Sequence, residues 1–245
     1  MSGSKVVLVT GSNSSIGFEL VRLLAEKGHS VYLGARNEIA GKEAQKLLNS
    51  NGLTNVKFVL LDVNDLATIE SARETIEKAE GKLDVLVNNA AIAKFEENQH
   101  ASSIALPTLR DVMETNFFGL VQTTNVFIPL MRKSAQAIIL NVSSALGSNT
   151  VQSRSTPRLG RPVAAYRASK AAVNSYTITL AQELQPEGFK VNTITPGLVS
   201  SRINHFAEEG KTLREGTLSL LPFVLLEKDG PTGKFFDWEG NEMPW

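Results

Sequence analysis

Short apolar runs alternate with longer segments of helical periodicity along the whole chain of 245 residues. The strand-like runs are Val6–Val9, Ser30–Leu33, Val56–Leu61, Leu83–Val87, Ile138–Val142, Val191–Thr195 and Lys234–Phe236. Between them, apolar residues recur at helical spacing in Ile16–Glu26, Ala40–Leu48, Ile69–Ala79, Leu109–Met131, Ala164–Leu184 and Leu213–Leu226. Short strands separated by helices form right-handed β-α-β units, so the pattern predicts a parallel sheet covered by helices on both faces.

The prediction is therefore one doubly wound α/β domain over residues 1–245, built on a seven-stranded parallel sheet. No internal linker interrupts the pattern, and the stretch Gly147–Pro162, rich in Ser, Arg, Pro and Gly, is typical of a surface loop. A sheet of this kind binds its ligand at the carboxyl ends of the strands. Residues that carry chemistry are expected directly after the strands.

Composition excludes several classes of function. The 25 basic and 25 acidic residues balance, so no nucleic-acid partner is indicated. Cysteine is absent and the histidines, His29, His100 and His205, are scattered, so no metal site is expected. No apolar run reaches the roughly 18 residues of a membrane span, and the N-terminus lacks a secretion signal. We expect a cytoplasmic protein with no membrane partner.

The first strand leads directly into a turn of small residues, Thr10–Gly17, and a helix follows. Backbone N–H groups in such a turn, together with the positive end of the helix, can approach a pyrophosphate. The candidate phosphate-binding residues are Gly11, Ser12, Asn13, Ser15, Ile16 and Gly17. Ordinary strand-to-helix loops use the same residue types, and the spacing differs from G-x-G-x-x-G, so the turn alone leaves both interpretations open.

The second strand ends at Arg36, which bears on the choice of cofactor. An acidic residue at this point would bond an unphosphorylated ribose, whereas an arginine accommodates a 2′-phosphate. Arg36 therefore favours NADP(H) over NAD(H). Glu38 follows closely enough to compete, and a solvated charge at the start of a helix is the alternative interpretation of Arg36.

The next two strands end in further candidate cofactor contacts. Asp62 and Val63 follow the third strand, where the carboxylate of Asp62 could accept from an adenine amine or cap the following helix. The fourth strand ends in small and polar residues, Asn89, Ala90 and Ala91, which let the backbone approach a ligand or form a plain turn.

Tyr166 and Lys170 lie four positions apart (i and i+4) at the predicted start of a helix. Residues at this spacing share one helical face, so the ammonium can lie beside the phenol. A nearby cation favours the phenolate and is expected to lower the pKa of Tyr166 toward the range of efficient proton transfer. A surface tyrosine beside a solvated lysine is the alternative.

Together these motifs resemble the short-chain dehydrogenase/reductase family along nearly the whole chain. The family's phosphate turn corresponds to Thr10–Gly17, its Asn-Asn-Ala-Gly motif to Asn88–Ala91 and its Tyr-x-x-x-Lys motif to Tyr166–Lys170. The family's catalytic Asn and Ser correspond to Asn116 and Ser144. The resemblance implies a Rossmann-type fold and a nicotinamide cofactor.

A further family motif, which lies against the nicotinamide, corresponds to Pro196 and Gly197, with Val199 as an additional cofactor contact. Within the family the carbonyl reductase branch is most similar, in the segment Thr115–Gly119 and in the C-terminal segment Asp229–Phe236.

Two positions depart from the family pattern. Ser15 and Ala91 replace glycines of the phosphate turn and of the fourth-strand motif. A serine in a left-handed conformation costs about 1–2 kcal/mol, so Ser15 either has an ordinary φ or weakens the binding of the cofactor. Ser14 stands where the branch often has a basic residue, which leaves Arg36 to support NADP(H) alone.

The resemblance implies reduction of an aldehyde or ketone, or the reverse oxidation of a secondary alcohol. Tyr166 would protonate the developing alkoxide, Ser144 would hold the substrate oxygen, and Lys170 would lower the pKa of Tyr166 and orient the cofactor. Asn116 would hold a water in a proton relay. The competing interpretations are a cofactor-binding sensor or scaffold with weak catalysis and an NAD-dependent alcohol oxidant.

Three variable loops are expected to select the substrate: residues 92–107, 146–164 and 198–210, of which the third would act as a lid. The family's long helices often pack against a partner subunit. The segment before Tyr166 is of intermediate length, so both a monomer and a homo-oligomer stay open.

Overall fold

Seven parallel strands form one sheet in the computed structural model, which describes residues 3–154 and 162–245. The strands are β1 (Val6–Val9), β2 (Ser30–Ala35), β3 (Val56–Leu60), β4 (Val85–Asn88), β5 (Ile138–Val142), β6 (Lys190–Ile194) and β7 (Phe235–Phe236). Their order in space is β3-β2-β1-β4-β5-β6-β7, and every neighbouring pair is parallel. The order reverses between β1 and β4, where a doubly wound sheet opens its binding crevice.

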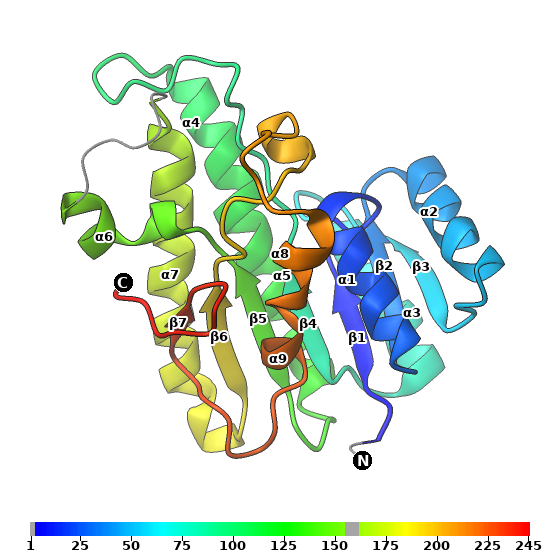
Figure 1. Cartoon of the computed structure of the whole chain (residues 1–245). Helices are drawn as coiled ribbons and strands as arrows, with labels where there is room; N and C mark the ends of the chain where they lie inside the picture. The colour runs from blue at the N-terminus through cyan, green and yellow to red at the C-terminus, as the bar shows by residue number, and fades with distance from the viewer. Residues whose placement is uncertain (1–2, 155–161) are drawn as a thin grey trace.

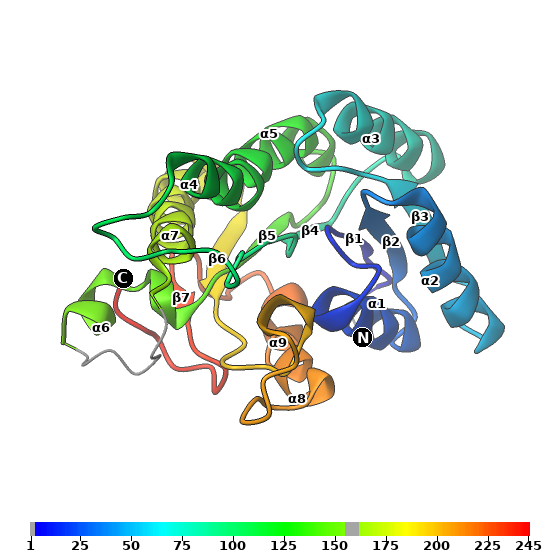
Figure 2. The same ribbon diagram turned by 90° about the horizontal axis from the view of Figure 1, so that it is seen from above.

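The helices lie in two layers, one on each face of the sheet (Figures 1 and 2). Those of the described residues are α1 (Ser15–Glu26), α2 (Glu38–Ser50), α3 (Leu66–Glu80), α4 (Leu106–Met113), α5 (Gly119–Met131), α6 (Asn149–Arg154), α7 (Ala164–Leu184), α8 (Leu213–Leu218) and α9 (Leu221–Val224). A π-helical segment, Glu114–Phe118, joins α4 to α5. The predicted single Rossmann-type domain is confirmed.

Alternation along the strands divides the core between the two layers. Val7 and Val9 of β1 pack with buried residues of α1, α2 and α9, whereas Val6 and Leu8 pack with those of α3, α5 and α7. Successive side chains of a strand point to opposite faces, so one strand with no polar residue serves both cores. The polar carboxyl ends of the strands are left for the site.

The structure differs from the predicted elements at three places. The expected helix Leu109–Met131 is interrupted by the π-helical segment, and the expected helix Leu213–Leu226 is two short helices, with Pro222 in the first turn of α9. The expected loop Gly147–Pro162 contains α6. Ser148 precedes α6, and its hydroxyl accepts from the Val151 N–H at 3.1 Å and donates to the Pro244 carbonyl at 2.6 Å. Residues 155–161 of the second substrate loop lie outside the described residues.

Within residues 3–154 and 162–245, none of the helices combines the length and the apolar character needed to cross a bilayer.

Candidate active site

A cavity of about 1290 Å³ opens at the carboxyl ends of the strands and extends from Arg36 past the phosphate turn to Tyr166. The predicted site residues that line it are Gly11, Asn13, Ser15, Ile16, Gly17, Arg36, Asp62, Val63, Asn89, Ala90, Ala91, Ser144, Tyr166, Lys170, Pro196, Gly197 and Val199. Two predicted residues, Ser12 and Asn116, are buried beside the cavity without lining it. The described part of the chain brings together no group of three His, Cys, Asp or Glu able to hold a metal ion.

The phosphate turn is held in shape from β4. Thr10 Oγ1 accepts from the backbone N–H groups of Asn89 and Ala90, both at 3.0 Å. The Asn89 side chain donates in return to the carbonyl oxygens of Thr10 at 2.9 Å and Gly11 at 3.1 Å. Gly11 has φ +60°, and a Cβ there would lie 2.7 Å from the Cα of Ala90. Only glycine fits this close approach, so the family's glycine is required here.

Ser12 stabilises the same turn from the inside. Its hydroxyl is fully buried and donates to the Val9 carbonyl oxygen at 2.8 Å. Ser12 therefore holds the turn through its side chain, whereas its neighbours line the cavity.

The N-terminus of α1 faces the cavity without a side-chain cap. Ser14 is the N-cap residue, but its side chain makes no capping hydrogen bond, and Ser15, Ile16 and Gly17 of the first turn line the cavity. The first N–H groups of a helix have no intrahelical acceptor, and the helix dipole is positive at this end. This donor set fits the pyrophosphate of a dinucleotide.

Ser15 has φ +54°, in the left-handed region. This is the region of φ that favours glycine, so the serine carries the strain. The Ser15 hydroxyl accepts from the backbone N–H of Arg202 at 3.3 Å. The phosphate turn is thereby joined to the third substrate loop.

Arg36 is exposed at the other end of the cavity, and its side chain has no partner among the residues that the structure describes. Glu38, the expected competitor, instead pairs with Lys42 at 2.6 Å on the first turn of α2. Asn37 caps that helix by accepting from the Ala40 N–H at 2.9 Å. The guanidinium of Arg36 is thus left free for an anion.

Asp62 lines the cavity and does not cap the following helix. Its Oδ1 accepts from the Asn64 N–H at 3.0 Å in a local turn, while Asp65 is the N-cap of α3. The cap that the sequence left as an alternative for Asp62 belongs to Asp65.

Tyr166 and Lys170 lie on the first two turns of α7, with the Lys170 Nζ 5.7 Å from the centroid of the phenol ring. Lys170 is only 3% exposed, and its Nζ donates to the Val142 carbonyl at 2.8 Å. Ser144 lies two residues beyond the end of β5, where its hydroxyl accepts from the Leu146 N–H at 3.2 Å and lies near enough to Tyr166 to influence the pKa of the phenol. The ring of Phe95 meets the Tyr166 ring edge-on at 5.5 Å.

Burial sets the ionisation of this pair. It raises the pKa of Tyr166 to about 12, an increase that the nearby Ser144 hydroxyl partly offsets. Burial also lowers the pKa of Lys170 to about 8. The expected lowering of the Tyr166 pKa by Lys170 is therefore wrong for this structure, because desolvation of the phenolate outweighs any attraction to the ammonium. Tyr166 keeps its proton at neutral pH and can act as an acid.

Asn116 lies in the π-helical segment and braces two parts of the site. Its Oδ1 accepts from the Ile92 N–H at 2.8 Å, and its Nδ2 donates to the Ile92 carbonyl at 2.8 Å and to the Ser169 hydroxyl at 3.0 Å. These contacts use both N–H groups of the amide and one of the two lone pairs of Oδ1. π-helical turns inside α-helices are frequent at functional sites.

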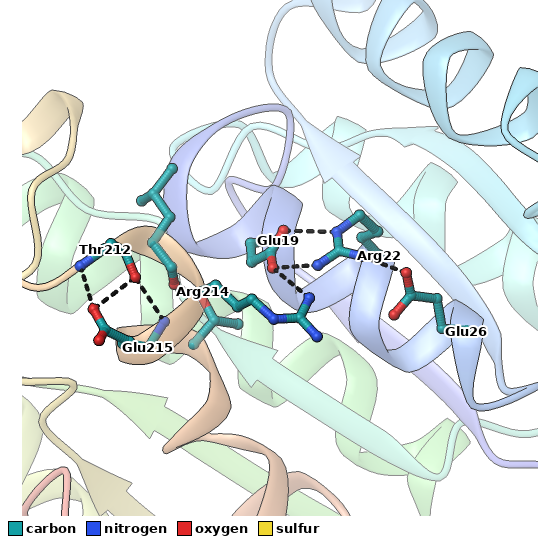
Figure 3. A network of polar contacts seen from close by, with 8 residues as sticks. Glu19, Arg22, Glu26, Thr212, Arg214 and Glu215 are labelled. Carbon is teal, nitrogen blue, oxygen red and sulfur yellow. Dashed lines mark hydrogen bonds and ion pairs between the residues drawn. The ribbon is translucent and has the colours of Figure 1, made fainter.

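The third substrate loop and the helix α8 that follows it each contact α1. Within the loop, the Arg202 N–H donates to the Ser15 hydroxyl. In α8, the Arg214 guanidinium lies 3.7 Å from the carboxylate of Glu19 of α1, which also pairs with Arg22 (Figure 3). Between these contacts, His205 and Phe206 both have left-handed φ values, of 55° and 57°. Two strained residues at the mouth of a cavity are typical of functional loops.

Gln99, in the first substrate loop, was missed by sequence reasoning although it contacts the backbone of Tyr166. A lone glutamine in a polar loop carries no motif, so no signal in the sequence could have identified it.

Comparisons with known proteins identify related chains. The profile of the family described as short chain dehydrogenase matches residues 5–212. Salutaridine reductase of Papaver somniferum is 30% identical over 95% of this chain and 94% of its own length, and (-)-isopiperitenone reductase of Mentha piperita is 32% identical over 95% and 96%. The crystal structure of an NADPH-bound carbonyl reductase from chicken fatty liver is 27% identical with a TM-score of 0.87, and the alignment covers 100% of both chains.

Proposed function

The chain belongs to the short-chain dehydrogenase family, and on that premise we propose that it is an NADPH-dependent reductase of aldehydes or ketones, able to run in reverse on secondary alcohols. Members of this family are oxidoreductases that use a nicotinamide cofactor. The observation that supports the proposal most is that Tyr166, Ser144 and Lys170 line one cavity together with a free Arg36, with the Lys170 Nζ 5.7 Å from the Tyr166 ring.

The bound cofactor would supply the hydride. Ser144 holds the carbonyl oxygen beside Tyr166, whose hydroxyl gives its proton to that oxygen as negative charge develops. The ammonium of Lys170 stabilises the phenolate that is left. Lys170 uses one N–H on Val142, and its further N–H groups are available to the ribose of the cofactor.

The preference for NADPH over NADH rests on Arg36. A guanidinium binds a phosphate through two parallel hydrogen bonds, and no carboxylate neutralises this one because Glu38 is paired with Lys42. The chicken relative was crystallised with NADPH bound, which supports the same choice.

We propose that the loops at 92–107, 146–164 and 198–210 bind the substrate within the single domain 1–245. Apolar side chains of these loops line the cavity: Phe95, Leu146, Val163, Leu198 and Phe206. Such a lining suits a carbonyl compound with an apolar body. The alignment with salutaridine reductase spans 298 positions, more than the 245 residues of this chain, so that relative has insertions that this chain lacks.

The test is oxidation of NADPH and NADH by the purified protein against a panel of aldehydes, ketones and diketones. Turnover with NADPH preferred is expected. Binding of NADPH without turnover on any carbonyl would instead favour a cofactor-binding sensor. Oxidation of secondary alcohols with NAD that is faster than carbonyl reduction would favour an NAD-dependent alcohol dehydrogenase.

The pH dependence of reduction should follow Lys170. We expect kcat/KM for the carbonyl, measured with saturating NADPH, to be level below pH about 8 and to fall above it, because the pKa of Lys170 is lowered to about 8 and the phenolate then loses its stabilising cation. The pKa of Tyr166, about 12, leaves the acid protonated over the whole range. A rate that rises through pH 8 would contradict these roles.

A further inference from the structure

We propose that Gln99 is a positioning residue that joins the first substrate loop to the catalytic helix α7, and so sets where the Tyr166 hydroxyl lies relative to the carbonyl. The inference rests on the proposed reductase function. Gln99 does not line the cavity, and it acts through residues that do.

The first set of Gln99 contacts caps the N-terminus of the catalytic helix α7. The first N–H groups of a helix need acceptors, and Val163, the N-cap residue of α7, provides none from its side chain. Gln99 provides two from outside the helix: its backbone carbonyl accepts from the Ala164 N–H at 3.2 Å, and its Oε1 accepts from the Tyr166 N–H at 3.4 Å. The backbone of the catalytic tyrosine is thus bonded to the loop.

The second set of Gln99 contacts fixes the backbone of the first substrate loop. The Gln99 Nε2 donates to the carbonyl oxygens of Ala93 at 2.7 Å and Lys94 at 2.8 Å. The backbone of Lys94 is left-handed, with φ +51°. The ring of the next residue, Phe95, packs edge-on against Tyr166. One side chain therefore fixes the tyrosine from its backbone and from its ring.

Gln99 is fully buried, so these hydrogen bonds have no competition from water. Only a carboxamide meets the local demand, because it offers two donors to the two carbonyl oxygens and an acceptor to the N–H. Glutamate would keep the acceptor but would set a buried carboxylate against two carbonyl oxygens. Methionine has a similar volume and would lose all three side-chain bonds.

The expected effect is on catalysis more than on the cofactor. Misplacement of a catalytic group by about 1 Å can cost about 10²-fold in rate, so Gln99→Met should lower kcat by about 10-fold or more and raise KM for the carbonyl. The phosphate turn and Arg36 are elsewhere in the cavity, so Kd for NADPH should change by less than about 2-fold, which is below 0.5 kcal/mol.

The experiment compares Gln99→Met with Gln136→Met. Gln136 also donates from Nε2 to a carbonyl oxygen, that of Leu226 at 2.9 Å, but lies outside the candidate active site. Both variants should lose stability, and only Gln99→Met should lose kcat. In a double-mutant cycle with Phe95→Ala, the loss from Gln99→Met should be smaller than in the wild type, since both act on Tyr166.

Hydrogen exchange gives a reading that needs no turnover. The amide of Tyr166, which is bonded to the Gln99 side chain, should exchange faster in Gln99→Met and should not change in Gln136→Met. An active wild type with equal kcat in the two variants would overturn the positioning role. If no protein turns over any carbonyl, the proposed function fails, and unchanged exchange at Tyr166 would then overturn the positioning role separately.

Discussion

Replacement of Tyr166 by phenylalanine is expected to reduce carbonyl reduction by about 10²–10⁴-fold, because the substrate oxygen loses its proton donor. The Tyr166 ring packs edge-on against Phe95, so the variant removes the acid and keeps the packing. NADPH oxidation with the best carbonyl of the panel would measure the loss.

Binding provides the control for this variant. NADPH affinity and the thermal midpoint of Tyr166→Phe should stay close to the wild-type values, because Lys170 and the phosphate turn are intact. A variant that keeps a tenth or more of the wild-type kcat would exclude Tyr166 as the acid. Loss of NADPH binding together with activity would mean that the substitution disturbs the cavity as a whole.

Arg36→Ala should weaken the binding of NADPH by about 10–10²-fold and leave the affinity for NADH unchanged. A hydrogen bond to a charged group contributes about 1.5–3 kcal/mol, and each 1.4 kcal/mol is about tenfold in affinity. The remaining contacts of the cofactor are common to both forms. Titration calorimetry with each cofactor would measure the selectivity directly.

Lys46→Ala is the matched control for Arg36. Lys46 is an exposed cation of the neighbouring helix α2, and it does not line the cavity. Its removal should change the affinity for NADPH much less. Equal losses for NADPH and NADH in Arg36→Ala would contradict the assignment of Arg36 to the 2′-phosphate.

The sheet could be predicted from the sequence because its signal is local. Buried parallel strands appear as short apolar runs, and all seven predicted strands are present. Two of them have the predicted ends, and in the other five an end is displaced by at most two residues, as at Leu83–Val87, observed as Val85–Asn88. The π-helical segment at Glu114–Phe118 could not be predicted, because π-helical turns are rare and five residues are too few for a separate periodicity to show.

The cavity lining could be predicted where a residue type has a local reason. Gly11 is required by a close backbone contact, and Arg36 directly follows a strand end. The ionisation of Tyr166 could not be predicted, because the sequence shows that Lys170 is near but not that burial outweighs it. The role of Gln99 depends on two segments that meet only in the folded chain.

The link between Ser15 and Arg202 has a thermodynamic consequence. A ligand that orders the phosphate turn also restrains the loop at 198–210, because one hydrogen bond joins them. If that loop binds the carbonyl as we propose, binding of the cofactor and binding of the carbonyl share a coupling free energy, and each changes the affinity of the other by the same factor. A glycine at position 15 would have no hydroxyl to make this bond, so the coupling depends on Ser15.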